Sequence, residues 1–291
     1  MRSSSTKKPN SSRSELTPTP TTSGGRAGRN LPAATAVGIG LIAVVFSSLV
    51  WFRPGFVGIA VAASLLAVRE LARALEHRGR HVVREVVYPA AVVIPAIAYL
   101  YSPEISLGVF AGSVVVIAWR RLGAGVERYF DDLAASVLVL AYVPLLIGFA
   151  TAMSAGDGGA ARVITMVLLT AGNDTGGYAA GVFFGKHPIA PSISPKKSWE
   201  GFAGSLLAQA ALGAFLVPQL LDIAAWQGVA LGLVMSITAT VGDFAESAIK
   251  RDLGVKDMSH ALPGHGGFMD RLDSLLINAL VASIAFTWMG V

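Results

Sequence analysis

Residues 242–273 read GDFAESAIKRDLGVKDMSHALPGHGGFMDRLD, a dense polar segment between two apolar ones. The segment holds five aspartates, one glutamate, four basic side chains and two histidines, whereas only 14% of the 291-residue chain is charged. The flanking segments, 224–242 and 274–290, are long enough to cross a bilayer as helices. Because 53% of the chain is hydrophobic, the sequence predicts a polytopic membrane protein with charged chemistry at a membrane surface.

Nine apolar segments are predicted to span the membrane, because a helix needs about 20 apolar residues to cross the bilayer core. We divide them into an N-terminal region of five spans, 31–160, and a C-terminal catalytic region of four spans, 161–291. The nine predicted spans are 31–51, 54–70, 87–102, 104–120, 132–151, 162–184, 201–218, 224–242 and 272–290.

The distribution of basic residues predicts the orientation. Residues 1–30 are rich in Ser, Thr, Pro, Gly and basic residues, which favours a disordered tail that is either a solvated anchor or a contact for lipid or a partner. With this tail in the cytosol, 21 of the 23 lysines and arginines face the cytosol, and only Arg53 and Arg162 fall outside. The positive-inside rule therefore favours a multi-pass protein of the cell membrane with a cytosolic active site.

A carboxylate inside the sixth predicted span needs an explanation. Placing Asp174 at membrane depth costs about 2.5–3.5 kcal/mol on insertion scales, so we interpret it as facing a cavity or the bundle interior for function. The alternative is a buried aspartate that only pairs with a neighbouring helix. Gly177 and Gly181 follow four residues apart, which favours close helix packing over direct ligand contact.

The segment 183–202, FFGKHPIAPSISPKKSWEGF, is predicted to be a cytosolic loop because three prolines interrupt the helix. Ser194, Lys196 and Lys197 offer hydroxyl and ammonium donors beside the start of the next helix, an arrangement that suits a phosphate group. The alternative is that the two lysines are only a topology signal. His187 is interpreted as structural or solvated.

Acidic residues in the opening segment form two groups at the same predicted membrane face. Asp243, Glu246 and Ser247 share one helix face, and Asp270 and Asp273 lie three residues apart at the start of the next helix. Converging carboxylates bind hard cations, and magnesium typically takes one or two of them plus substrate phosphates. The alternative for the second pair is stabilisation of a helix N-terminus.

The residues between the two acidic groups suit an anionic ligand. Lys250, Arg251 and Lys256 supply positive charge for phosphates, and the glycine turn around His265 and Gly266 lets backbone approach a ligand closely. Acids for a metal, bases for phosphates and a glycine turn together predict a nucleotide and metal site. The chain has no cysteine, which excludes thiol catalysis, disulfides and cysteine-based zinc sites.

The pattern SxxKRxxxxKDxxxxxPGHGGxxDRxD, which begins at Ser247 and ends at Asp273, resembles the signature of the phosphatidate cytidylyltransferases, also called CDP-diacylglycerol synthases. The resemblance extends upstream to NDTGGYxxGxxFGKHP and SPKKSWEG and covers roughly 170–275, without a departure inside the motif. It implies an all-α membrane fold and transfer of CMP from CTP to phosphatidic acid, giving CDP-diacylglycerol and pyrophosphate in phospholipid biosynthesis.

We assign roles within that expected reaction as hypotheses, with Mg²⁺ as cofactor and a second cation left open. The expected metal ligands are Asp243, Glu246, Asp270 and Asp273. The expected catalytic residues are Asp243, Asp270, Asp273, Lys250 and Arg251. The expected substrate-binding residues are Asp174, Ser194, Lys196, Lys197, Ser247, Lys256, His265, Gly266 and Arg271, with a turn-stabilising role as the alternative for His265.

Two other function classes are weighed against this one. A CTP-dependent lipid kinase needs the same nucleotide and metal, so composition does not exclude it. A secondary transporter also uses intramembrane acids and broken helices, but the chain shows no paired inverted halves and its charges cluster on one face. The expected partners are CTP, phosphatidic acid and the lipid bilayer, with no nucleic acid and with a homodimer left open.

Overall fold

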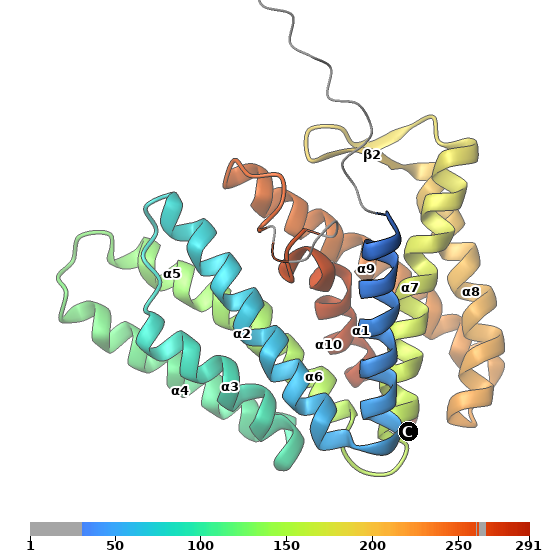
Figure 1. Cartoon of the computed structure of the whole chain (residues 1–291), viewed down its shortest axis with the longest axis horizontal. Coiled ribbons are helices and arrows are strands. Elements are labelled where there is room, and N and C mark those ends of the chain that lie inside the picture. The colour runs from blue at the N-terminus through green and yellow to red at the C-terminus, as the bar shows by residue number, and fades with distance from the viewer. Residues whose placement is uncertain (1–30, 260, 262–265) are drawn as a thin grey trace, which may run out of the picture.

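The computed structural model describes residues 31–259, 261 and 266–291, and within the first helix it describes the side chains of 40 and 42–51. The expected basic tail and the expected substrate contact His265 lie outside these residues. The described chain is almost wholly helical (Figure 1). Its elements are α1 (Leu31–Trp51), α2 (Arg53–His77), α3 (Arg84–Leu100), α4 (Pro103–Leu122), α5 (Tyr129–Leu140), the π-helical η1 (Ala141–Leu145), α6 (Leu146–Met153), α7 (Gly159–Phe184), β1 (Pro188–Ala190), β2 (Ser194–Ser198), α8 (Trp199–Leu221), α9 (Ala225–Asp252) and α10 (Met269–Met289).

Helix boundaries follow local signals in the sequence. Proline occupies the first turn of α2 and of α4, where its missing N–H would have no intrahelical partner. The Ser102 hydroxyl accepts a hydrogen bond from the Ile105 N–H at the start of α4, and Ser198 does the same for Gly201 at the start of α8. Gly290 ends α10 in the left-handed conformation that glycine adopts most readily.

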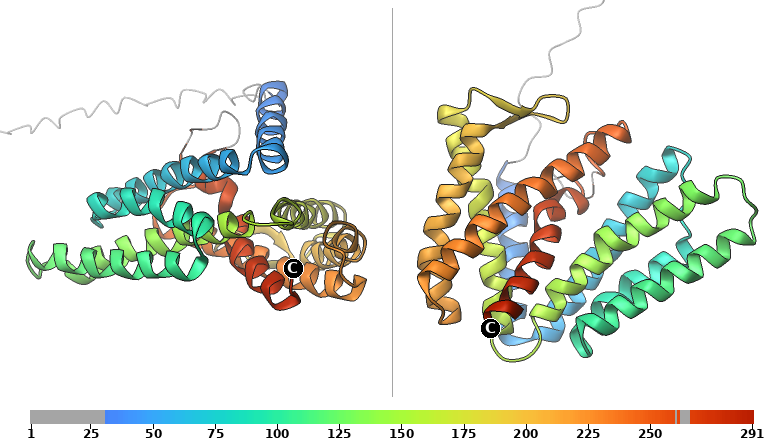
Figure 2. Two further views of the ribbon diagram at one scale, coloured as in Figure 1. Left: turned by 90° about the horizontal axis from the view of Figure 1, so that it is seen from below. Right: turned by 180° about the vertical axis from the view of Figure 1, so that it is seen from behind.

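The helices form two groups joined by α10. Figure 2 shows α2 to α6 on one side and α7 to α9 on the other, with α10 between them. One buried apolar cluster combines α2, α3, α5 and α6 with Met269 and Leu276 of α10. The other combines α1, α7, α8 and α9 with Ala279, Ala282 and Phe286 of α10. α10 therefore contributes to both clusters, as do α2 through Phe56 and α6 through Met153.

A helix occupies each of the nine ranges predicted as spans, within the described residues and with α5, η1 and α6 counted as one continuous helix. Six of these helices are long and apolar enough to cross a membrane by themselves: α2, α4, the continuous helix Tyr129–Met153, α8, α9 and α10. The multi-pass α-helical class is therefore confirmed. The count of nine spans, the cytosolic N-terminus and the division at 160 stay predictions.

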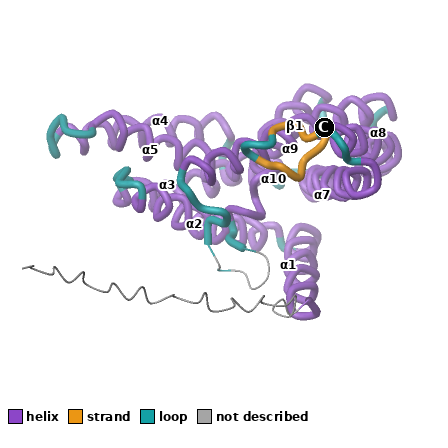
Figure 3. Tube along the Cα trace, turned by 90° about the horizontal axis from the view of Figure 1, so that it is seen from above, coloured by secondary structure: helices purple, strands orange, loops and turns teal. Residues whose placement is uncertain are grey.

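The segment expected to be a cytosolic loop contains a β-hairpin. Strands β1 and β2 pair antiparallel, with Pro188 opposite Ser198 and Ala190 opposite Ser194. α7 ends at Phe184, before the first of the three prolines, and the prolines leave enough N–H groups for a short ladder. Figure 3 shows the hairpin over the ends of α9 and α10, beside α7. The hairpin therefore fixes the expected phosphate donors on a regular element.

Small residues let the C-terminal helices approach closely. A Cβ atom on Gly228 of α9 would lie 2.0 Å from the carbonyl oxygen of Gly213 on α8. On α7, a Cβ atom on Gly177 would lie 2.4 Å from the Ser205 hydroxyl of α8. Gly177 thus packs closely against α8, whereas Gly181 has room for a methyl group, with its nearest neighbours 3.8 Å away. Contact of either glycine with a ligand, the alternative, stays a prediction.

Candidate active site

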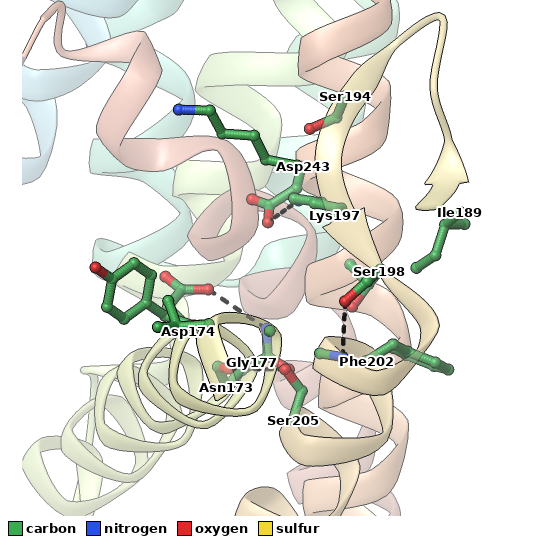
Figure 4. Close-up of a pocket in the computed structure, with 16 residues that line it drawn as sticks. Asn173, Asp174, Gly177, Ile189, Ser194, Lys197, Ser198, Phe202, Ser205 and Asp243 are labelled. Atoms are coloured by element: carbon green, nitrogen blue, oxygen red, sulfur yellow. Dashed lines mark hydrogen bonds and ion pairs between the residues drawn. The ribbon is translucent and has the colours of Figure 1, made fainter. Parts of the chain in front are cut away.

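A cavity of about 540 Å³ opens where the hairpin meets α7, α8 and α9 (Figure 4). This volume lies within the range of small-molecule sites, about 300–1,000 Å³. Five of the expected site residues line the cavity. They are Asp174 from α7, Ser194, Lys196 and Lys197 from β2, and Asp243 from α9.

An ion pair between Lys197 and Asp243 closes one wall of the cavity (Figure 4). The Lys197 ammonium also lies 4.9 Å from the centre of the Phe244 ring, a cation–π contact. The other Asp243 oxygen accepts a hydrogen bond from the Ser274 hydroxyl of α10. The side chains of Lys197 and Asp243 are 31% and 18% exposed, so both charges remain within reach of a ligand.

Asp174 faces this ion pair from α7. Its neighbour Asn173 is buried, accepts a hydrogen bond from the Ser236 hydroxyl at 2.8 Å, and donates to an Asp174 oxygen at 3.4 Å. The charges of Asp243 and Lys197 both act on the Asp174 carboxylate. The carboxylate expected to face a cavity does so, and α7 is fixed there by the buried amide beside it.

A second set of charges continues from α9 to α10. Lys250 lies 2.5 Å from a Glu246 oxygen and 3.0 Å from an Asp270 oxygen. The Asp270 carboxylate also accepts hydrogen bonds from the backbone N–H groups of Met258, at 3.0 Å, and of Gly267, at 2.8 Å. The Glu246 and Asp270 side chains are 1% and 4% exposed. This set is therefore deeper and more fully paired than the cavity wall.

Asp273 links the two sets of charges. It follows Asp270 by one helical turn, is half-buried, and interacts electrostatically with both Asp243 and Glu246. Its carboxylate accepts a hydrogen bond from the Ser274 N–H at 2.8 Å. The two acidic groups predicted from the spacing thus meet between α9 and α10, with Asp273 at their junction.

The carboxylates suit a magnesium ion that substrate phosphates also ligate. One oxygen of the buried Glu246 carboxylate, Oε1, has no hydrogen-bond partner among the described residues, so it has free capacity for a cation. Within the described ranges, however, no three acidic or histidine side chains gather into a metal-binding group. Magnesium needs only one or two carboxylates when phosphates and water complete its shell, so the donor set fits.

The sequence comparisons identify the family to which this site belongs. A model of the cytidylyltransferase family matches residues 32–289, nearly the whole described chain. The chain belongs to the cytidylyltransferase family. The family inferred from the signature is thereby confirmed, over a longer range than the signature itself.

Named relatives of this cytidylyltransferase cover most of its length. The phosphatidate cytidylyltransferase of Mycobacterium leprae is 39% identical over 285 residues, 88% of each chain. That of Mycobacterium bovis is 38% identical over 284 residues, 92% of each chain. That of Staphylococcus saprophyticus is 36% identical over 166 residues, 53% of this chain and 61% of its own. The similarity to the mycobacterial proteins thus includes the N-terminal helices.

Three expected site residues of this cytidylyltransferase, Arg251, Lys256 and Ser247, belong neither to the described lining of the cavity nor to the charged set around Lys250. The Arg251 side chain donates a hydrogen bond to the Ile193 carbonyl oxygen at 3.2 Å and so holds the hairpin against α9. Lys256 is exposed beyond the end of α9, and Ser247 is half-buried one turn after Asp243. Their roles toward substrate stay predictions.

Two further expected residues lie beside the carboxylates of α10. Gly266 has a backbone φ of +82°, and a Cβ atom there would lie 3.0 Å from an Asp270 oxygen, so the glycine lets backbone pass close to that carboxylate. Arg271 is exposed, and its charge acts on Asp174. His187, outside the cavity, pairs with Glu200 at 2.5 Å, consistent with the structural role predicted for it.

Sequence reasoning missed Tyr142. This side chain lies on η1, is 8% exposed, and its hydroxyl has no hydrogen-bond partner in the described part of the chain. The charges of Glu246, Asp273 and Asp243 all act on it. Pro144 lacks an N–H and disturbs the helical ladder here, and π-helical segments often occur at functional sites. A tyrosine in an apolar span gives no sequence signal, apart from the proline two residues later.

Proposed function

We propose that this enzyme transfers CMP from CTP to phosphatidic acid, giving CDP-diacylglycerol and pyrophosphate, at a magnesium-dependent site on the cytosolic face of the cell membrane. One observation carries the proposal. The cavity combines ammonium groups of Lys196 and Lys197 with the carboxylates of Asp174 and Asp243, at the membrane-helix ends where a lipid headgroup and a nucleotide can meet. The relatives named phosphatidate cytidylyltransferase supply the substrate class.

The reaction joins two anions, so its barrier contains a large charge-repulsion term. A phosphate oxygen of phosphatidic acid attacks the α-phosphorus of CTP and forms a new P–O bond. The bond from that phosphorus to the bridging oxygen breaks, and pyrophosphate leaves with the electron pair. Positive groups fixed at the site lower the barrier because they act on charge that develops in the transition state.

We assign the positive groups of the site to different parts of the substrates. Lys197 is held against Asp243, and we assign it to the CTP phosphates, with Lys196 and Ser194 as further donors on the same strand. Lys250 lies between Glu246 and Asp270 and supplies positive charge on the α10 side. Both ammonium groups have carboxylate partners, which keep them oriented before substrate arrives.

Magnesium is assigned to the carboxylates at the junction of α9 and α10. Asp243 and Asp273 are the first choices because they lie between the cavity and the deeper charges, and Glu246 and Asp270 complete the set. When bound, the ion neutralises phosphate charge and favours departure of pyrophosphate. The side chains of this site would orient the ion, and Lys250 would balance the remaining negative charge.

The cytosolic orientation is supported by the distribution of charge. The ends of α2, α9, α10 and the hairpin meet at one end of the molecule, as the contacts Arg80–Asp252 and Arg251–Ile193 require. Most of the 23 lysines and arginines belong to segments at that predicted face. A nucleotide made in the cytosol would reach the cavity there. A C-terminal reporter found in the cytosol would contradict the nine-span topology.

The test is pyrophosphate release from purified enzyme in detergent, with CTP, Mg²⁺ and phosphatidic acid. We expect release with phosphatidic acid and none with diacylglycerol, which lacks the attacking phosphate. CTP labelled at the α-phosphate separates the lipid kinase alternative, because a cytidylyltransferase places the α label in lipid whereas a kinase places the γ label there. Lipid labelled only from the γ position would refute the proposal.

A further inference from the structure

Glu70 is a buried carboxylate that lies outside the signature region. It projects from α2, is 7% exposed, and belongs to the N-terminal group of helices. Its oxygens accept hydrogen bonds from the Ser259 hydroxyl at 2.5 Å and from the backbone N–H groups of Phe268, at 3.1 Å, and Met269, at 2.9 Å. Ser259 and Phe268 belong to the connection between α9 and α10, and Met269 is the first residue of α10, so one side chain of α2 contacts both the connection and the helix that follows it.

Glu70 and Asp270 both accept hydrogen bonds from this connection. Asp270 accepts from the N–H groups of Met258 and Gly267, whereas Glu70 accepts from the residues next to them, Ser259 and Phe268. A Cβ atom on Gly267 would lie 2.5 Å from a Glu70 oxygen, so a glycine is needed for this approach. The position of the Asp270 backbone is therefore linked to Glu70 through two hydrogen-bonded neighbours.

Two residues that directly follow α2 contact the end of α9 and the start of the same connection. The Arg78 side chain donates to the Leu253 carbonyl oxygen at 2.8 Å, and Arg80 pairs with Asp252 at 3.1 Å. A Cβ atom on Gly254 would lie 2.0 Å from the Arg78 guanidinium, so the chain passes directly against it. Glu70 of α2 and the residues directly after that helix thus support the polar segment together.

The environment of Glu70 indicates why a carboxylate occupies this buried position. No lysine or arginine among the described residues forms an ion pair with it. Its charge is instead stabilised by the N–H groups at the start of α10, where the helix dipole favours an anion. A buried carboxylate without a cation is costly unless it is hydrogen-bonded, and the three hydrogen bonds from Ser259, Phe268 and Met269 meet that need.

We propose that Glu70 is a positioning residue for the transfer reaction, which holds the amino-terminal turn of α10 so that Asp270 and Asp273 stay at the site. This inference rests on the proposed function. Glu70 is not among the described residues that line the cavity, so it acts through the carboxylates of α10 and not by touching substrate. Its loss should lower kcat more than it raises the KM for CTP, because the CTP donors lie on the hairpin.

The decisive variant is Glu70→Gln. Whichever way the new amide turns, its NH₂ group faces the N–H of Phe268 or of Met269, so at least one backbone donor loses its acceptor. The matched control is Glu76→Gln, the same change on the same helix, where the carboxylate pairs with Arg84 instead of the α10 terminus. A second variant, Ser259→Ala, removes one donor to Glu70 and leaves the two backbone contacts.

The experiment measures kcat and the KM for CTP in detergent, the melting temperature, and hydrogen exchange of the 266–270 amides. For Glu70→Gln we expect kcat to fall about ten-fold or more, equivalent to about 1.4 kcal/mol, with faster exchange of those amides and a KM changed by less than about three-fold. Ser259→Ala should lower kcat by a smaller factor, and Glu76→Gln should match the wild type.

Each other outcome has a defined meaning. A wild-type kcat per folded molecule in Glu70→Gln, with or without a lower melting temperature, would overturn the inference because Glu70 would then only stabilise the fold. If Glu70→Gln does not fold, the Ser259→Ala variant tests the inference in its place. A wild-type kcat together with wild-type hydrogen exchange in Ser259→Ala would then overturn the inference. If the wild type and Glu76→Gln both fail to make CDP-diacylglycerol, the proposed function is wrong, whereas the exchange measurement still tests whether Glu70 holds the α10 terminus.

Discussion

Replacement of Lys197 by alanine should raise the KM for CTP. In the structure the ammonium lies at the cavity wall, 31% exposed, paired with Asp243 and 4.9 Å from the Phe244 ring centre. A hydrogen bond between charged groups contributes about 1.5–3 kcal/mol, which corresponds to a ten- to hundred-fold change in affinity at about 1.4 kcal/mol per decade. Since Lys197 is assigned to phosphates in both bound and transition states, kcat should fall by a smaller factor.

The fold should tolerate this change. Asp243 keeps the Ser274 hydroxyl as a donor, and its 18% exposure lets water replace the ammonium. The assay is steady-state pyrophosphate release at varied CTP and saturating phosphatidic acid in detergent. Lys186→Ala removes an exposed lysine before the hairpin and serves as the control. Lys197→Arg should recover part of the affinity.

Two results would refute the reasoning. A KM for CTP within about two-fold of wild type in Lys197→Ala would remove Lys197 from the CTP site, since the expected loss is at least ten-fold. An equal rise in Lys186→Ala would show that only the general positive charge of the hairpin matters. A selective rise in the KM for phosphatidic acid would instead assign Lys197 to the lipid headgroup.

Four further predictions follow from the same geometry. Asp270→Asn should lower kcat by about 100-fold or more in protein that remains folded in detergent, and retained turnover would remove Asp270 from the active site. Tyr142→Phe should raise the melting temperature by roughly 2–4 °C per kcal/mol of added folding stability, because it deletes a buried hydroxyl without a described partner. We also expect its kcat to fall, and an unchanged kcat would show that Tyr142 is only structural. Gly228→Ala should lower the melting temperature by an overpacking cost of about 1–3 kcal/mol, since its Cβ would meet Gly213, whereas Gly112→Ala, with nothing within 4 Å, should not. Chelation with EDTA should abolish pyrophosphate release and added Mg²⁺ should restore it; full activity after chelation would contradict the metal assignment.

The spacing of residues along the sequence located some of the expected site residues correctly. It did not show which side chains on other helices these residues would contact. The i, i+3 and i+4 pattern placed Asp243 and Glu246 on one helix face and Asp270 and Asp273 on the next, and the structure brings these faces together. The spacing did not show that Lys250 lies between Glu246 and Asp270. Side chains on different helices meet according to how the helices pack, which spacing within one helix does not contain.

Residues that sequence reasoning overlooked have partners far along the chain. Glu70 accepts a hydrogen bond from Met269, which lies 199 positions later in the sequence. Tyr142 lies in a π-helical segment, and charges on α9 and α10 act on it. Glu70 is the last residue of the predicted second span, 54–70, and its carboxylate holds the start of α10. Neither residue belongs to a local pattern, so only the tertiary contacts reveal it.

The sequence by itself determined that this is a multi-pass helical membrane protein of the cytidylyltransferase family, and which segment holds its charged chemistry. Those properties depend on hydropathy over about 20 residues and on a long motif, both of which are local. The tertiary structure alone decided the pairing of Lys197 with Asp243, the support from α2, and the role of α10 in both cores. The physical reason is that helix contacts depend on small residues such as Gly213 and Gly228, whose close approach sets which side chains meet.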